Sequence, residues 1–254
     1  MRPYPISIEW PPAAMEGQKP VPEARKAVRK RLGLPEDVQL AVGIERFDYT
    51  KGILDRMHGV DALLTAHPEL IGHFCFMQAA APTRSKLANY KSLQEEAEAL
   101  AREISERHGG PFDVIQLVAR HHDPEEVFEL FRAAELCIVS SLHDGMNLVA
   151  KEFVAARDDE QGVLILSAFA GASRELGEAL IVNPYDAHAM GEAFYWALTM
   201  EASEQRERMR VMREQVEARN VYRWAGQMLL DAARLRKKQR IMRLIDKERG
   251  RAQG

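Results

Sequence analysis

Two acids lie near the ends of a ten-residue run in the middle of the chain, His143 to Glu152. Asp144 directly precedes Gly145, and seven residues separate it from Glu152. We expect Gly145 to let the backbone turn sharply and a helix to begin near Asn147, with free N–H groups aimed at the loop. One acid could then accept hydrogen bonds from a sugar ring while the other holds ribose hydroxyls.

The residues between the acids, Met146 to Val149, offer a small apolar and backbone platform for a base and phosphates. An acid in the middle of a helix is more often a solvated side chain or the partner of a cation one turn away. That alternative stays open for Glu152 on the sequence alone.

Two cations, Arg46 and Lys51, lie in a second run, Glu45 to Gly52. Arginine can bind two oxygens at once and lysine supplies a compact charge, so this pair beside a helix N-terminus would suit a diphosphate. The alternative is that Arg46 pairs with Asp48 or Asp55 at the surface. The glycines form neither a GxGxxG nor a Walker pattern, which leaves dinucleotide and P-loop interpretations without support.

Short apolar strands alternate with helices along most of the chain. The expected strands cover residues 38–43, 73–78, 114–118, 136–140, 163–167 and 179–182, and the expected helices cover residues 53–65, 85–108, 125–134, 147–157, 187–200, 203–218 and 221–247. Continuously apolar strands between helices are typical of a parallel sheet covered on both faces. We therefore predict an α/β fold, a doubly wound, Rossmann-like sheet that binds ligands beyond the carboxyl ends of its strands, near a switch point.

The chain divides into three expected parts. Residues 1–36 are proline-rich and read as an interdomain linker or strap, with an extended piece at Ile6 to Ile8 and a short helix from Glu23 to Leu32. The Rossmann-like domain is expected over residues 37–220. Residues 221–254 are expected to form an amphipathic helix and a basic tail.

The formal net charge is −3 for 254 residues, so no global charge favours a nucleic-acid or membrane partner. The charge is uneven, because residues 201–254 carry 15 lysines and arginines against 8 acids. A partner-binding helix and a helix packed on the sheet with a solvated end both fit this basic segment.

The two cysteines, Cys75 and Cys137, each lie inside an apolar run, which is typical of buried reduced thiols. No spacing of cysteine and histidine suggests a metal, so we expect neither a metal nor a cofactor. The chain has no apolar leader and no run near the roughly 18 apolar residues of a membrane helix. These features predict a cytoplasmic protein.

Five motifs together resemble the trehalose-6-phosphate synthase family. They cover residues 45–52, 81–84, 144–155, 167–172 and 183–186. That family contains metal-independent, retaining glycosyltransferases with two Rossmann domains, the GT-B type, and the resemblance covers about residues 3–230. Because residues 1–8 resemble the junction between the two domains, the resemblance implies that this chain is the C-terminal, donor-binding half only. It is then a truncated chain, a degenerate gene product or one half of a split enzyme.

The resemblance assigns the reacting groups. Arg46 and Lys51 match the pair that holds the donor diphosphate and stabilises it as it leaves, and fixed cations there would lower the barrier. Asp144 matches the acid that binds hydroxyls of the donor sugar. Arg84 matches an arginine that reaches the acceptor phosphate. No protein nucleophile is needed in this family, so paired glycosidase carboxylates are not expected.

The remaining donor contacts also come from the resemblance. Gly145, Met146 and Asn147 match the backbone that contacts sugar and phosphate. Leu148 and Val149 match the uridine platform, and Glu152 matches the ribose-binding acid. His121 and His122 lie at the strand end where the family places contacts to the base and the donor. The implied reaction transfers glucose from a nucleotide sugar, UDP-glucose by preference, to a phosphorylated acceptor such as glucose-6-phosphate. Trehalose-6-phosphate would form with retention of configuration.

His122 stands where the family often has an aromatic residue, and three residues just before Asp144 also depart from the family pattern. His143 stands where the family usually has arginine, and Ser140 and Ser141 stand where threonine and proline are more common. A glucosylglycerol-phosphate synthase-like enzyme and a non-catalytic nucleotide-sugar-binding subunit therefore stay open. The partners implied are a nucleotide sugar, a sugar-phosphate acceptor and a separate N-terminal Rossmann half or a second copy of the chain.

Overall fold

Six parallel strands form one sheet in the computed structural model, which describes residues 3–82 and 88–251. The strands are β1 Gln39–Arg46, β2 Phe74–Ala81, β3 Ile115–Val118, β4 Leu136–Val139, β5 Val163–Ser167 and β6 Leu180–Val182. Their order in the sheet is β3-β2-β1-β4-β5-β6, and each neighbouring pair is parallel. The order reverses between β1 and β4, which is the switch point of a doubly wound sheet.

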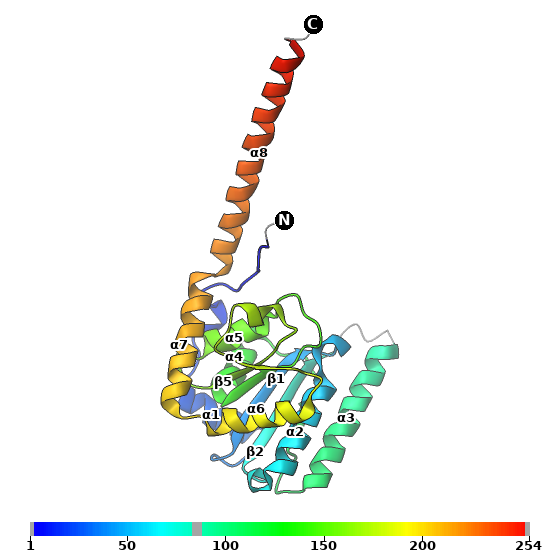
Figure 1. Cartoon of the computed structure of the whole chain (residues 1–254). Helices are drawn as coiled ribbons and strands as arrows, with labels where there is room; N and C mark the ends of the chain where they lie inside the picture. The colour runs from blue at the N-terminus through cyan, green and yellow to red at the C-terminus, as the bar shows by residue number, and fades with distance from the viewer. Residues whose placement is uncertain (1–2, 83–87, 252–254) are drawn as a thin grey trace.

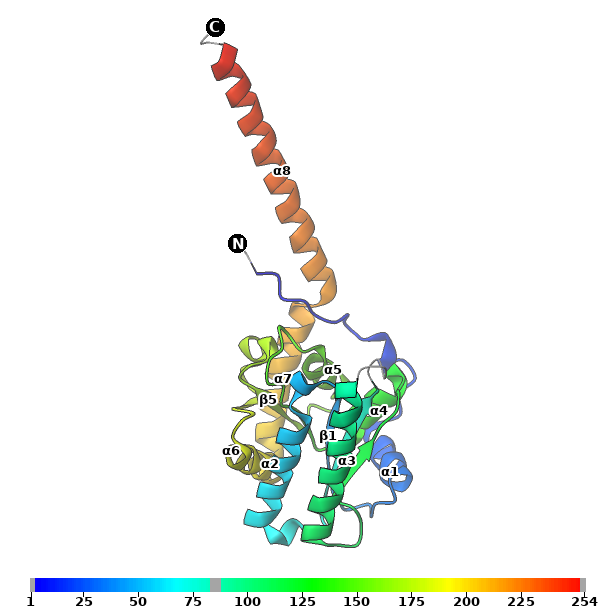
Figure 2. The same ribbon diagram turned by 90° about the vertical axis from the view of Figure 1, so that its right-hand side faces the viewer.

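Helices cover both faces of this sheet (Figures 1 and 2). They are α1 Val21–Arg31, α2 Ile53–Ala66, α3 Ala88–His108, α4 Pro124–Ala133, α5 Leu148–Ala156, α6 Ala187–Thr199, α7 Ala202–Ala218 and α8 Val221–Arg251. In Figure 2, α1 and α4 lie on one side of β1, and α2 and α6 lie on the other. The predicted α/β, doubly wound, Rossmann-like fold with long C-terminal helices is confirmed.

The central strand β1 shows why the apolar runs become sheet. Leu40 and Val42 join a core cluster with residues of α4, α5 and α7, whereas Ala41 joins a second cluster with residues of α2, α3 and α6. Side chains alternate between the two faces of a strand, so successive residues of a strand that is buried on both faces are mostly apolar. Each fully buried leucine or valine contributes about 1.5–3 kcal/mol of transfer free energy.

Both β1 and β2 extend beyond their expected ends at Gly43 and Gln78. Their pairing continues to Arg46 opposite Ala81. Glu45 lies beyond the expected end of β1, and Gln78 is the last residue of the second expected strand. Both are polar, and both are buried. They remain in the sheet because Arg56 donates to Glu45 Oε1 and Gln78 Oε1, and Gln78 Nε2 donates to Gly43 O, so most of their polar atoms are paired.

The N-terminal segment does not join the sheet at Ile6 to Ile8, where the sequence indicates an extended piece. Its carbonyl groups instead bind elements of the domain: Ile8 O accepts from Val221 N at 2.8 Å, and Ile6 O accepts from Lys151 Nζ at 2.9 Å. Further along, α1 packs on the domain with Val28 fully buried. The first residues of the chain are therefore bound by a lysine side chain and by the first amide of α8, and not by hydrogen bonds to a neighbouring strand.

The last helix, α8, extends away from the domain (Figure 1). Large apolar side chains along it are exposed, among them Leu229, Leu230 and Leu235. Within the described part of the chain, no helix has the length and apolar character needed to cross a bilayer.

Candidate functional site

An ion pair joins the segments that follow β1 and β4, at the switch point. Lys51 Nζ donates to Asp144 Oδ2 at 2.5 Å, and the two side chains are 19% and 17% exposed. Open α/β sheets bind ligands beyond the carboxyl ends of the strands at this position. The structure thus brings together one cation and one acid from the two runs singled out in the sequence.

The loop that carries Lys51 is shaped by its neighbours. Asp48 accepts a hydrogen bond from Thr50 N at 2.9 Å and so begins a short 3-10 helix, Tyr49–Lys51. Gly52 follows with φ of 64°, and a Cβ there would lie 2.3 Å from Ser140 O. Only glycine allows both the left-handed conformation and this close approach between the loops after β1 and β4.

The loop that carries Asp144 ends in an asparagine cap. Asn147 Oδ1 accepts from Ala150 N at 3.1 Å, while its Nδ2 donates to Asp144 Oδ2 at 3.3 Å. The sharp turn expected at Gly145 falls at Asn147, which has φ of 81°. Asparagine tolerates positive φ because its short side chain binds the nearby backbone. Gly145 itself is exposed, and a Cβ there would meet nothing within 4 Å.

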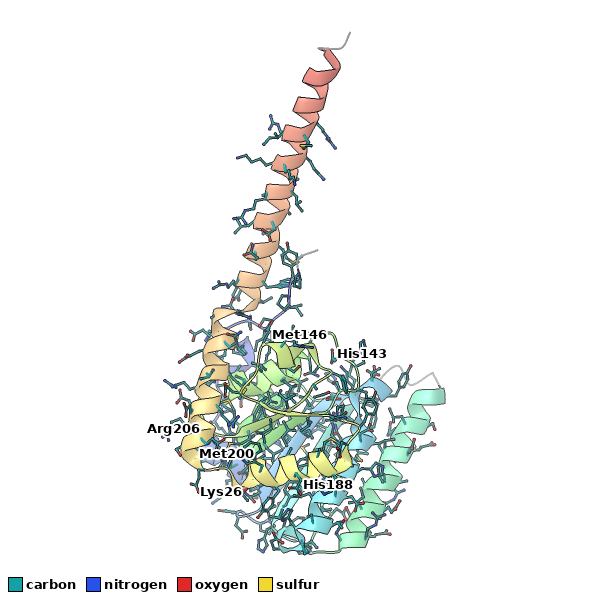
Figure 3. All side chains as sticks on the ribbon, viewed as in Figure 1. Lys26, His143, Met146, His188, Met200 and Arg206 are labelled. Carbon is teal, nitrogen blue, oxygen red and sulfur yellow. The ribbon has the colours of Figure 1, made fainter. Side chains whose placement is uncertain are left out.

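Backbone hydrogen bonds fix this loop to the segment after β5. Asp144 N donates to Phe169 O at 3.2 Å, Gly171 N donates to Asp144 O at 2.9 Å, and Ala172 N donates to Met146 O at 2.7 Å. Figure 3 shows Met146 and His143 at the end of the domain from which α8 extends. The Asp144 carboxylate therefore sits on a backbone that is held in place without a ligand.

Replacing Gly171 by alanine is expected to displace this loop. A Cβ at Gly171 would lie 2.1 Å from Gly145 O and 3.1 Å from Met146 Cα, and both atoms belong to hydrogen-bonded backbone. We expect a loss of about 1–3 kcal/mol in the free energy of unfolding, measured by urea denaturation. Gly177→Ala is the matched control, because a Cβ there meets nothing within 4 Å. Equal stability of the two variants would contradict the tight packing of Gly171.

The surroundings of Asp144 favour its ionised form. Burial alone would raise the pKa of this carboxyl, but the hydrogen bond and charge of Lys51, with hydrogen bonds from Met146 N and Asn147, hold the pKa below its usual range. Asp144 is thus a half-buried carboxylate that accepts hydrogen bonds, as a group that binds hydroxyls must.

Glu152 is partly buried on α5, and burial raises the pKa of its carboxyl. Its neighbours one turn away are Leu148 and Ala156, so no i,i+4 ion pair can form. Among the residues that the structure describes, no hydrogen bond or ion pair to this carboxylate is found. A carboxylate in this setting is open to a ligand that carries hydroxyl groups.

Arg46 is exposed at the end of β1. In the described ranges it makes no ion pair with Asp48 or Asp55, the partners that the sequence left open. Its guanidinium is therefore accessible from solvent.

Other predicted residues lie at different distances from this centre. Met146, Leu148 and Val149 are partly buried and pack on the core cluster beside the loop. His121 and His122 follow β3, which is separated from β1 by β2. His121 is exposed and His122 is buried; burial, and then the charge of Arg120, lower the pKa of His122. Arg84 lies outside the described residues.

Two groups in the site region were not predicted as functional. Lys151 is 1% exposed, and its Nζ donates to Glu175 Oε2 at 2.7 Å. Ser140, one of the departures from the family pattern, donates from Oγ to Gly52 O at 2.8 Å and accepts from Arg56 Nε at 2.8 Å. The partners of both residues are distant in the chain, so the local sequence does not predict these contacts.

Curated proteins similar to this chain are trehalose-phosphate synthases. A trehalose-6-phosphate synthase of Citrobacter koseri is 35% identical over 230 residues, which are 90% of this chain and 48% of that protein. An alpha,alpha-trehalose-phosphate synthase (UDP-forming) of Pichia angusta is 33% identical over 215 residues, which are 83% of this chain and 44% of that protein. The chain spans about half the length of the curated relatives it matches.

Solved structures agree with these relatives. A synthase of Burkholderia xenovorans in complex with glucose-6-phosphate matches with a TM-score of 0.82 and 33% identity, over 90% of this chain and 50% of that one. A structure from E. coli, bound with UDP-2-fluoro glucose, matches with a TM-score of 0.82 and 34% identity over the same shares. The model of the protein family described as Glycosyltransferase family 20 matches residues 1–234 of this chain. Sequence and fold together show that this chain belongs to glycosyltransferase family 20.

Proposed function

We propose that this chain supplies the donor site of a retaining glucosyltransferase that transfers glucose from UDP-glucose to glucose-6-phosphate. The observation that carries the proposal is the Lys51–Asp144 pair at the switch point. Glu152, on the helix that follows the Asp144 loop, is an acid without a described partner. Relatives whose names or structures include UDP, UDP-2-fluoro glucose and glucose-6-phosphate support the choice of donor and acceptor.

Each residue takes a role that its setting supports. Lys51 and Arg46 bind the diphosphate, since both can direct a cation into the region beyond β1. Asp144 accepts hydrogen bonds from hydroxyls of the glucose, and Glu152 accepts them from the ribose. The exposed backbone around Gly145, the amides at the start of α5 and the apolar side chains Met146, Leu148 and Val149 complete the proposed donor platform.

The proposed reaction breaks the bond between the anomeric carbon and the diphosphate oxygen. An acceptor hydroxyl attacks from the face that the diphosphate leaves, and its proton passes to the departing phosphate oxygen, so configuration is retained. Negative charge grows on the leaving group in the transition state, and fixed cations stabilise it there more than in the ground state. Lys51 and Arg46 are the groups of this chain that would do so.

The acceptor side of the reaction is proposed to involve a second unit. The relatives are about twice as long as the matched region, and an N-terminal Rossmann half is the partner that would complete the cleft. Arg84 is the residue of this chain proposed to reach the acceptor phosphate. Mixing the full chain with such a half and measuring trehalose-6-phosphate formation tests transfer; donor binding without transfer would favour the alternative of a non-catalytic nucleotide-sugar-binding subunit.

Donor binding itself is tested by calorimetry with UDP-glucose. We expect Glu152→Gln to weaken binding about tenfold, because the neutral amide is a poorer acceptor for ribose hydroxyls than the carboxylate. Glu207→Gln on the exposed face of α7 is the matched control and should leave the Kd unchanged. An unchanged Kd in Glu152→Gln would remove this residue from the site, and failure of the unaltered chain to bind UDP-glucose or GDP-glucose would overturn the proposed function.

A further inference from the structure

A fully buried arginine lies beneath the loop that carries Lys51. Arg56, in the first turn of α2, has 0% exposure. Its Nη2 donates to Lys51 O at 2.7 Å and to Glu45 Oε1 at 2.8 Å, and its Nε donates to Ser140 Oγ at 2.8 Å. One planar guanidinium thus binds the loop after β1 and the segment after β4 at the same time.

The space for this guanidinium is built into the sheet. A Cβ at Gly43 would lie 2.5 Å from Arg56 Nη1 and 2.8 Å from Gln78 Oε1, so an alanine in the middle of β1 would displace both groups. Nη1 also donates to Gln78 Oε1 at 3.3 Å and to Ile138 O at 3.4 Å. Arg56 therefore connects β1, β2 and β4, the three strands at the centre of the sheet.

The charge of Arg56 offsets a buried acid behind the site. The Glu45 side chain is 2% exposed, and its Oε2 has no hydrogen-bond partner in the described structure. Burial raises the pKa of Glu45, whereas Arg56 and then Lys51 act to lower it. Without Arg56, the Lys51 ammonium would be the cation left in electrostatic reach of this carboxylate.

The geometry points to Arg56 as a positioning residue for Lys51. Its hydrogen bond to the Lys51 carbonyl fixes the backbone of the loop, and its contact with Ser140 sets the distance from that loop to the segment that leads to Asp144. Its pairing with Glu45 leaves the Lys51 ammonium to Asp144, beyond the carboxyl ends of β1 and β4. This inference rests on the proposed function, since it makes Arg56 a determinant of diphosphate binding.

The test compares UDP with uridine on the full chain. Two variants are used: Arg56→Lys, which keeps a cation for Glu45 but lacks the planar fork, and Arg56→Gln combined with Glu45→Gln, which removes both buried charges. Arg157→Gln is the matched control, because Arg157 is also fully buried and paired with Asp159 but lies at the end of α5. Calorimetry gives the Kd of each ligand at a temperature where thermal unfolding shows every variant folded.

We expect both Arg56 variants to bind UDP about tenfold to a hundredfold more weakly, because a small displacement of a binding group has effects of this size. Uridine, which lacks the diphosphate, should lose less than about threefold. Arg157→Gln should lower the melting temperature without changing either Kd. Equal losses for UDP and uridine, or unchanged UDP binding in both Arg56 variants, would overturn the positioning role alone. Failure of the unaltered chain to bind UDP would overturn the proposed function and this inference with it.

Discussion

Replacing Lys151 by methionine is expected to lower the free energy of unfolding by about 3–5 kcal/mol, because removal of one partner leaves the other as an uncompensated buried charge. Lys151 is 1% exposed, and Glu175, its partner at 2.7 Å, is 8% exposed. Methionine retains the unbranched apolar stem, so most of the packing of the lysine chain is kept. Urea denaturation followed by circular dichroism measures the change.

A double variant separates the charge effect from packing. If the loss arises from the unpaired Glu175 carboxylate, then Lys151→Met combined with Glu175→Gln should recover a large part of the stability, since no buried charge remains. Lys26 paired with Glu36 supplies the comparison at an exposed position, where water and salt screen the pair, so Lys26→Met should change the stability little. A loss in Lys151→Met as small as that in Lys26→Met would contradict the role of the buried pair.

The consequence of this pair extends to the N-terminal segment. Lys151 also donates to Ile6 O, so one ammonium joins α5, the 3-10 helix before Glu175 and the start of the chain. Glu152, the proposed ribose-binding acid, is the next residue on α5. The same variant is therefore expected to loosen the N-terminal segment, which limited proteolysis near Ile6 would detect.

The alternation of apolar strands and helices was sufficient to predict the doubly wound sheet. Strands that are buried on both faces are easy to recognise in a sequence, because their residues are continuously apolar, as from Leu40 to Val42. The ends of β1 and β2 were not predictable in this way. Glu45 and Gln78 are polar residues at or beyond the ends of the apolar runs, and the sequence does not show that Arg56, which is local to neither strand end, binds both.

The candidate site was predictable as a region but not as a set of contacts. The strand-end rule places Lys51 and Asp144 at one edge of the sheet although 93 residues separate them. Their contact depends on β1 lying next to β4, and the local sequence pattern does not predict the order of the strands. The same rule also selects His121 and His122 as site residues, but they follow β3, which is the outermost strand on its side of the sheet. Lys151 gave no signal, because a lysine on a helix is usually solvated.

Replacing Lys51 by methionine is expected to weaken UDP binding about a hundredfold, because a partly buried cation that binds the diphosphate contributes a charge-assisted contact. Asp144→Asn should instead strengthen the binding of UDP. The Lys51 ammonium is bound to Asp144 at 2.5 Å, so loss of the carboxylate charge frees the cation and should raise UDP affinity by up to about fivefold. UDP-glucose should gain less, because the amide introduced by Asp144→Asn is a poorer acceptor for glucose hydroxyls than the carboxylate.

The pH dependence of UDP-glucose binding distinguishes the two acids of the site. The pKa of Asp144 is lowered, so its pairing with Lys51 contributes stability that is present above the unfolded-state pKa and is lost only as the pH falls through the lower folded value. The pKa of Glu152 is raised above 4.5 by burial, so its carboxylate is lost first as the pH falls. We therefore expect UDP-glucose binding to weaken on acidification before the Lys51–Asp144 pair breaks, and this first step should be absent in Glu152→Gln. UDP-glucose is used because its doubly esterified diphosphate, unlike the terminal phosphate of UDP, does not titrate near about pH 6. Calorimetric titrations from about pH 8 downward measure this weakening, and an unchanged first step in Glu152→Gln would show that another group of the site is responsible.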